Sequence, residues 1–195
     1  MSPPTRELEL KARVDDVASA RSAVERAGAV LGFKGILRDR LYDSTSRALS
    51  GRDHVLRVRT YESDGGNVHA HLDWKGPTSR DGDFKAREEL TSGVSDPLAL
   101  GEMLARLGFG IVAAIDRRVA QYELAVDGEC AVIRFEIYPR MDTLVEVEGT
   151  PDGIELGIRA VGIARECFTA QRLRDFVREY EARSGLRAAT SDADV

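Results

Sequence analysis

Charged residues alternate with apolar ones in several short segments of the chain. Residues 7–13 read Glu-Leu-Glu-Leu-Lys-Ala-Arg, and the pairs Arg57 with Arg59 and Lys85 with Arg87 repeat the same spacing. Because a β-strand points alternate side chains to opposite faces, charges two residues apart share a face. Guanidinium groups bind phosphate oxygens through forked hydrogen bonds, and clustered carboxylates bind hard divalent cations. If these faces enclose one space, the sequence predicts a site for a metal-bound polyphosphate.

The candidate site residues are carboxylates and cations. The carboxylates are Glu7, Glu9, Glu89, Glu136, Glu146 and Glu148. The cations are Lys11, Arg57, Arg59, Lys75, Arg87, Arg134 and one of the adjacent pair Arg117 and Arg118. An antiparallel sheet often has one wet face, where such charges need no function. We favour an enclosed site, because Arg recurs on strand after strand where Thr, Ser, Gln and Lys would be typical of a solvated face.

Periodicity and turn-forming residues place the elements that must position these side chains. Strands are expected at residues 7–14, 33–42, 54–61, 68–75, 84–91, 111–124, 131–138 and 143–148. Helices are expected between Asp16 and Gly28, between Asp96 and Gly108, and over residues 154–164 and 169–183. Many strands with few helices between them predict an α+β fold. Its largely antiparallel sheet closes into a barrel of about eight strands, with the helices packed outside.

The composition is that of a folded protein in a reducing compartment. The 195 residues are 43% apolar and 31% charged, and their net charge is −5. An acidic balance argues against nucleic-acid binding, and no apolar run is long enough to span a membrane. Two isolated cysteines, Cys130 and Cys167, are expected to be small buried side chains in a cytoplasmic protein. We expect one domain over residues 1–187 and a disordered tail over residues 188–195.

Short motifs follow one another in order along the chain. They are ExExK at residues 7–11, Tyr-Asp at 42–43, LRxR at 56–59, K-G-P at 75–77, RxE at 87–89 and ExE at 146–148. Over residues 5–185 this series resembles the CYTH, or triphosphate tunnel metalloenzyme, family. The layout is most similar to its class IV adenylate cyclase branch. The resemblance implies an eight-stranded barrel around a tunnel that binds a triphosphate and Mg²⁺ or Mn²⁺.

Roles for the candidate residues follow from the resemblance. It implies metal ligands at Glu7, Glu9, Glu146 and Glu148, with Glu89 contributing. It implies phosphate contacts at Lys11, Arg57, Arg59, Lys75, Arg87 and Arg118, to which the strand pattern adds Arg134. We assign Lys11 and Glu136 as catalytic. Two positions depart from the family pattern: Glu136 stands where Asp is frequent, and Thr91 stands where a second acidic residue is frequent.

Several functions stay open from the sequence. The first is cyclisation of ATP to cyclic AMP and pyrophosphate. The second is hydrolysis of inorganic triphosphate, thiamine triphosphate or a nucleoside triphosphate, and the third is binding of polyphosphate or nucleotide without turnover. A barrel with apolar faces inward would instead be a lipocalin-like carrier. His69, His71 and Asp73 share a strand face and form a weak candidate for zinc. A homodimer is an open alternative to a monomer.

Overall fold

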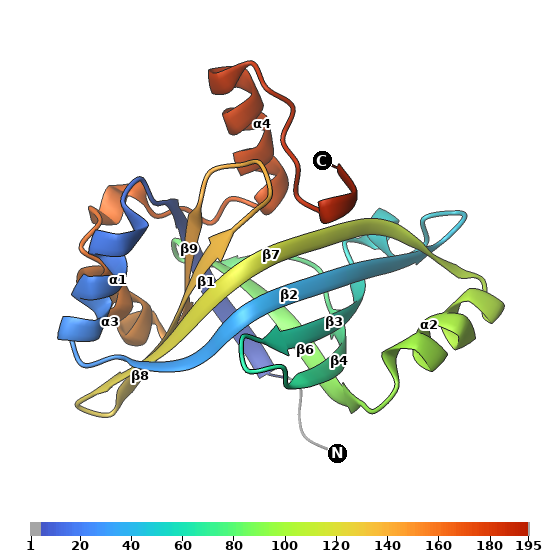
Figure 1. Ribbon diagram of the computed structural model, residues 1–195, viewed down its shortest axis with the longest axis horizontal. Coiled ribbons are helices and arrows are strands. Elements are labelled where there is room, and N and C mark those ends of the chain that lie inside the picture. The colour runs from blue at the N-terminus through green and yellow to red at the C-terminus, as the bar shows by residue number, and fades with distance from the viewer. Residues whose placement is uncertain (1–4, 195) are drawn as a thin grey trace.

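The computed structural model describes residues 5–194, and its strands form one antiparallel sheet (Figure 1). The strands are β1 (Thr5–Arg13), β2 (Val30–Ser44), β3 (Val55–Ser63), β4 (Val68–Lys75), β5 (Ser79–Asp81), β6 (Phe84–Val94), β7 (Phe109–Val126), β8 (Glu129–Ile137) and β9 (Leu144–Gly149). Their order is β1-β9-β8-β7-β2-β3-β4-β6-β5, and β6 also pairs with β1. That last pairing closes eight strands into a ring, with the short β5 beside β6. The predicted α+β barrel is confirmed.

Four α-helices of the described chain lie outside the barrel. They are α1 (Val17–Arg26), α2 (Pro97–Arg106), α3 (Pro151–Val161) and α4 (Leu173–Ser184). The Asp16 side chain accepts a hydrogen bond from the backbone N–H of Ser19, and Asp96 caps α2 in the same way. Both predicted helix starts are therefore confirmed. In Figure 1, α1 and α3 lie together on one side, α2 lies on the other, and α4 stands over one end of the barrel.

Apolar side chains on the outer face of the barrel form the main core with α1 and α3. Leu10 on β1, Ile133 on β8 and Val147 on β9 are all fully buried there. A Cβ at Gly157 of α3 would lie 2.6 Å from a Val147 methyl group, so glycine permits close packing of this helix on the sheet. Because the apolar faces point outward, the carrier hypothesis is wrong.

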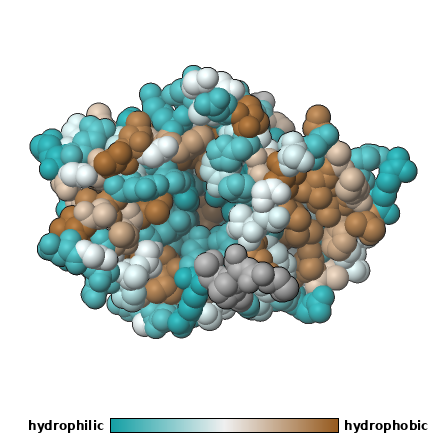
Figure 2. Space-filling view, turned by 90° about the horizontal axis from the view of Figure 1, so that it is seen from below, coloured by the Kyte–Doolittle hydropathy of each residue, from teal (hydrophilic) through white to brown (hydrophobic). Residues whose placement is uncertain are grey.

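The charged faces point into the barrel. Seen from the end away from α4, hydrophilic side chains border a central hollow (Figure 2). None of the helices within residues 5–194 is long and apolar enough to cross a membrane.

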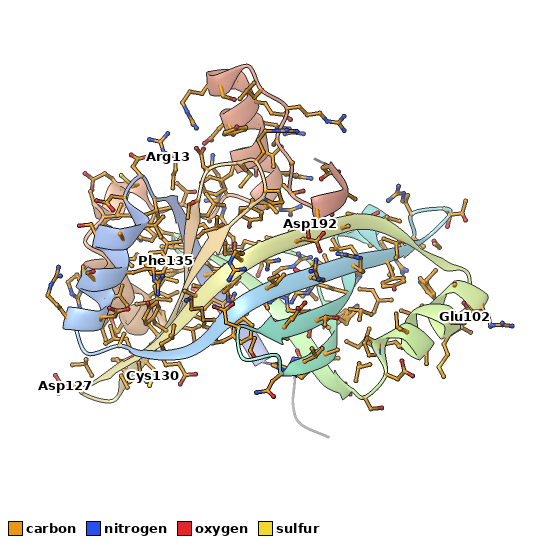
Figure 3. All side chains as sticks on the ribbon, in the orientation of Figure 1. Arg13, Glu102, Asp127, Cys130, Phe135 and Asp192 are labelled. Atoms are coloured by element: carbon orange, nitrogen blue, oxygen red, sulfur yellow. The ribbon has the colours of Figure 1, made fainter. Side chains whose placement is uncertain are left out.

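The cysteine prediction is wrong. Cys130 and Cys167 are both exposed. Cys130 lies at the start of β8, next to the tight turn that contains Asp127 (Figure 3), and Cys167 lies in a short 3₁₀ turn over Arg165–Cys167. Both positions are at the ends of elements, where the chain turns at the surface and a side chain has few neighbours.

The C-terminal segment also differs from the disordered tail that we expected. Ala189 and Ser191 are buried, and the backbone N–H of Asp116 on β7 donates to the carbonyl of Thr190. The Ser191 hydroxyl donates to the Asp116 carboxylate at 2.6 Å. Asp192 begins a 3₁₀ turn over Asp192–Asp194 beside the barrel (Figure 3). A buried carboxylate needs hydrogen-bond donors, and these residues supply them. Val195 lies outside the described residues.

Candidate active site

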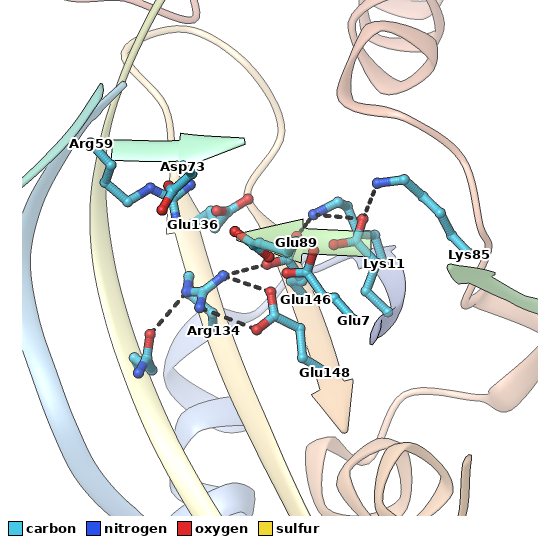
Figure 4. Close-up of polar contacts among 12 residues, drawn as sticks. Glu7, Lys11, Arg59, Asp73, Lys85, Glu89, Arg134, Glu136, Glu146 and Glu148 are labelled. Carbon is cyan, nitrogen blue, oxygen red and sulfur yellow. Dashed lines mark hydrogen bonds and ion pairs between the residues drawn. The ribbon is translucent and has the colours of Figure 1, made fainter. Parts of the chain in front are cut away.

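A cavity of about 380 Å³ inside the barrel is lined by ten cationic and seven carboxylate side chains. The cations are Lys11, Arg57, Arg59, Lys75, Lys85, Arg87, Arg117, Arg134, Arg172 and Arg174. The carboxylates are Glu7, Glu9, Asp39, Asp53, Glu136, Glu146 and Glu148. Most of the candidate residues therefore share one enclosed space, as the strand alternation predicts (Figure 4). Charges in such a space must be paired or bound to a ligand.

Three of the carboxylates form a compact cluster. Glu7 and Glu9 on β1 and Glu148 on β9 each offer an oxygen within 4.8 Å of the others. The sheet register places Glu9 directly opposite Glu148. Burial and the neighbouring charge of Glu148 raise the pKa of Glu7 to about 7, although Lys75 opposes the rise. For Glu9, the charges of Lys11 and Lys85 outweigh burial and lower the pKa to about 2.

Ammonium groups contact these carboxylates directly. Lys75 on β4 pairs with Glu7, and its Nζ lies 3.1 Å from an oxygen of Glu89. Lys85 on β6 pairs with Glu9. The expected ligand Glu89 thus faces the same space, but it lies outside the three-carboxylate cluster of the described residues. Lys85 was not among our candidate site residues, although its alternation with Arg87 on β6 could have identified it.

Glu146 belongs to a second group of buried charges that lines the same cavity. Its carboxylate pairs with both Lys11 and Arg134, and Arg134 also donates to Glu148 at 3.0 Å. Arg134 is fixed on its other side, where Nε donates to the side-chain oxygen of Gln121 at 3.0 Å. Lys11 is buried, and burial lowers its pKa. Arg134 connects this group to the three-carboxylate cluster.

Asp39 on β2 is the centre of the arginine side of the cavity. Arg59 donates to it twice, Nε to Oδ1 at 2.7 Å and Nη2 to Oδ2 at 2.9 Å. Arg117 donates at 3.0 Å, and Arg57 reaches it at 3.5 Å. Although burial opposes the change, these three cations hold the pKa of Asp39 well below its usual range. Asp39 was not among our candidate site residues, although it shares a strand face with Leu41 just before the Tyr-Asp motif.

The assignment of Arg118 to the phosphate site is wrong, and Arg117 takes the inward position. Arg118 lies opposite Ile137 on the outer face, and its guanidinium pairs with Asp64 at 2.8 Å. Arg117 is buried and donates to Glu136 at 2.7 Å. Neighbouring residues on a strand face opposite sides, so only one of the two could enter the cavity. The register of β7 against β8 decides which one does.

Glu136 lies between Arg117 and Tyr138. The Tyr138 hydroxyl donates to its carboxylate at 2.7 Å. Burial alone would raise the pKa of Glu136, but the charges of Arg117 and Lys11 lower it to about 2. Glu136 is therefore a carboxylate at neutral pH and a poor proton acceptor. Its geometry is that of a residue that fixes Arg117.

Arg87 and Arg172 lie at the end of the cavity beneath α4. Arg87 Nε donates to the carbonyl of Gly76 at 2.7 Å, and its Nη2 contacts the carbonyl of Asp53. The Asp53 side chain pairs with Arg172 at 2.9 Å. The K-G-P turn thus holds Arg87 through a backbone oxygen. Arg172, the N-cap residue of α4, also lines the cavity.

The weak zinc candidate is not assembled. Asp73 accepts two hydrogen bonds from Arg57, at 3.0 and 2.6 Å, and one from Thr91. His69 and His71 lie instead against Tyr61. Within residues 5–194, the group of three or more metal-ligating side chains is Glu7, Glu9 and Glu148.

The three-carboxylate cluster fits a divalent cation. All of its donors are hard carboxylate oxygens, the ligands that Mg²⁺ and Mn²⁺ prefer. Burial and the neighbouring carboxylate of Glu148 raise the pKa of Glu7, and the charge of a bound cation would oppose both effects. Glu7, Glu9 and Glu148 would hold the ion in the same cavity that the arginines line.

The fold and the site define a class of protein, namely antiparallel barrels whose interior combines clustered carboxylates with many lysines and arginines. The chain matches the model of the CYTH domain over residues 5–148, and it belongs to that family. No curated protein matches the chain.

Solved structures share the fold over most of their length. A proposed adenylate cyclase from Vibrio parahaemolyticus is 16% identical with a TM-score of 0.72, over 88% of this chain and 97% of that one. The PH1819 protein from Pyrococcus horikoshii is 23% identical with a TM-score of 0.70, over 89% and 98%. A proposed adenylyl cyclase from Hippeastrum, described as having a dominant triphosphatase activity, is 15% identical with a TM-score of 0.60, over 92% and 96%. At these identities the likeness shows the fold.

Proposed function

We propose that this protein is a divalent-metal-dependent enzyme that acts on a triphosphate bound inside the barrel. The first reaction that we assign is cyclisation of ATP to cyclic AMP and pyrophosphate, as in the class IV adenylate cyclase branch. The observation that carries the proposal is the cavity itself, where the Glu7, Glu9 and Glu148 cluster faces inward-pointing lysines and arginines. A linear chain of three phosphates needs both a cation to share its oxygens and donors along its length.

The present ion pairs can exchange for contacts with substrate and metal. Lys75 and Lys85 each occupy a carboxylate of the three-carboxylate cluster. Glu7, Glu9 and Glu148 would hold the metal, which would supply Lewis-acid activation of a phosphoryl oxygen. Lys75 and Lys85 would then be free to contact phosphate oxygens. The exchange replaces one set of opposite-charge contacts with another, so no buried charge is left unpaired.

The cavity cations would stabilise the transition state. During displacement at phosphorus, negative charge redistributes over the non-bridging oxygens. Hydrogen-bond donors that are already fixed in place stabilise this charge, because they need not move during the reaction. Arg57, Lys11 and Arg134 supply such donors from three different strands. Glu136, which we assigned as catalytic from sequence, would act by positioning Arg117 rather than by accepting a proton, because its pKa is about 2. Glu146 would fix Lys11 and Arg134.

Hydrolysis of the triphosphate is the second candidate reaction. The same donors and metal ligands serve attack by water on a terminal phosphorus. The Hippeastrum protein, which has the same fold, is described as having a dominant triphosphatase activity. Hydrolysis should therefore be tested alongside cyclisation. Binding of polyphosphate or nucleotide without turnover is the third candidate function. A cytoplasmic location, the lack of nucleic-acid partners and a homodimer stay predictions from the sequence, as does a single domain over residues 1–187.

Product analysis separates these reactions. The purified protein is incubated with Mg²⁺ or Mn²⁺ and, separately, ATP or inorganic triphosphate. Cyclic AMP with pyrophosphate establishes a cyclase. Faster release of orthophosphate, above all from inorganic triphosphate, establishes a triphosphatase. Binding of either compound without any product establishes a binder, and the absence of both binding and turnover overturns the proposal.

A further inference from the structure

Four aromatic rings gather on neighbouring strands at the end of the barrel away from α4. This aromatic cluster consists of Phe33 on β2, Tyr61 on β3, and His69 and His71 on β4. Tyr61 and His69 are stacked, with ring centroids 4.5 Å apart and planes 7° apart. Phe33 and His71 each lie edge to face with Tyr61, with ring centroids 5.5 and 5.4 Å from its own. The cluster is therefore a continuous aromatic surface.

The aromatic cluster shares the inner face of the sheet with the charged cavity. Tyr61 lies two residues from Arg59 on β3, and His71 lies two residues from Asp73 on β4, so each pair points to the same side. The Arg59 guanidinium carbon lies 5.9 Å from the centre of the Tyr61 ring. Arg59 thus contacts the carboxylate of Asp39 on one side and the cluster on the other. The aromatic cluster begins where the lining of cations ends.

These rings are accessible. His69 is exposed, and Phe33, Tyr61 and His71 are only half-buried. The main apolar core lies on the opposite, outer face of the barrel, so packing of that core does not explain them. The hollow seen in Figure 2 opens at this end of the barrel. Aromatic faces exposed beside a phosphate-binding surface are typical of sites that stack nucleic-acid bases.

We propose that the aromatic cluster is the binding site for the base of a nucleoside triphosphate whose phosphates lie in the charged cavity. This inference rests on the proposed function and names its substrate class. The base extends the stack that His69 makes with Tyr61, and the ribose lies near Arg59. Stacking uses the face of a base rather than its edge, so the site tolerates different bases. The protein then prefers a nucleoside triphosphate to inorganic triphosphate.

Two ligands that differ only by the nucleoside test this inference. Calorimetric titrations with Mg²⁺ give the dissociation constants of ATP and of inorganic triphosphate, with product analysis of the same samples. In His69→Ala, the dissociation constant of ATP rises about tenfold, because one stacking partner is lost. That of inorganic triphosphate is unchanged. The matched variant His69→Phe keeps a ring and retains the affinity for ATP. The double variant His69→Ala/His71→Ala loses more affinity for ATP than the single one.

Other outcomes overturn the inference. Unchanged ATP affinity in both alanine variants removes the aromatic cluster from the binding site. If the alanine variants bind ATP and inorganic triphosphate equally more weakly, the aromatic cluster stabilises the barrel rather than binding a base. If the unmodified protein binds inorganic triphosphate as tightly as ATP, the base has no site, while the proposed function stands. If it binds neither compound, the proposed function itself fails.

Discussion

Arg59 holds Asp39 through two parallel hydrogen bonds, from Nε to Oδ1 at 2.7 Å and from Nη2 to Oδ2 at 2.9 Å. The two residues lie directly opposite each other on β3 and β2. Both are buried, and Asp39 also accepts from Arg117. One carboxylate therefore fixes guanidinium groups from separate strands inside the cavity.

Asp39→Asn should lower the free energy of unfolding by about 3 kcal/mol, because it leaves buried guanidinium charges without their carboxylate. Urea denaturation measures the change. The matched control is Asp64→Asn, which alters the exposed pair with Arg118 and should cost less than about 1 kcal/mol. Equal effects of the two substitutions would contradict the central role of Asp39.

Glu9→Gln should reduce metal-dependent turnover roughly a hundredfold or more while the protein stays folded, because the amide keeps the shape of the side chain but removes a charged metal ligand. Turnover is measured as product release from a triphosphate, and the folded state is checked by circular dichroism. Glu88→Gln is the control, since Glu88 is exposed on β6. Undiminished activity in Glu9→Gln would contradict the assignment of Glu9 as a metal ligand.

Arg57→Ala should weaken the binding of inorganic triphosphate by roughly tenfold, because it removes charge-assisted hydrogen bonds to the phosphates. The loss should be largest at low salt, where the lost attraction is least screened. Calorimetry at two salt concentrations measures it. Arg118→Ala, on the outer face, should leave the dissociation constant unchanged. A greater effect at Arg118 than at Arg57 would argue that phosphate does not enter the barrel.

Acid should destabilise the protein through Glu136. Its pKa is about 2 in the folded protein against 4.5 as the usual value, so the folded state binds fewer protons between these limits. The stabilisation is fully present above about pH 5 and is lost as the pH falls toward 2. Unfolding free energies from urea denaturation between pH 3 and about 6 test this. Glu136→Gln should flatten the dependence, and an unchanged slope would assign the acid sensitivity to other groups.

Local rules of sequence determined a large part of this structure. Alternation in residues 7–11 put Glu7, Glu9 and Lys11 on one strand face, and the structure shows all three lining the cavity. Asp16 and Asp96 located the starts of two helices, since a side chain that caps a helix acts on the next three residues. These features depend on neighbours in the chain, and a sequence contains that information.

Contacts between distant segments were decided by the tertiary structure alone. Register between β7 and β8 turned Arg117 inward and Arg118 outward, and ring closure set Glu148 of β9 beside Glu7 and Glu9 of β1. Asp39 is central to the site only because three arginines from β3 and β7 contact its carboxylate. The C-terminal residues were ordered by Asp116, 75 positions before Ser191. Each outcome depends on which strands pair and in what register, and pairing energies are set by the whole barrel rather than by any single segment.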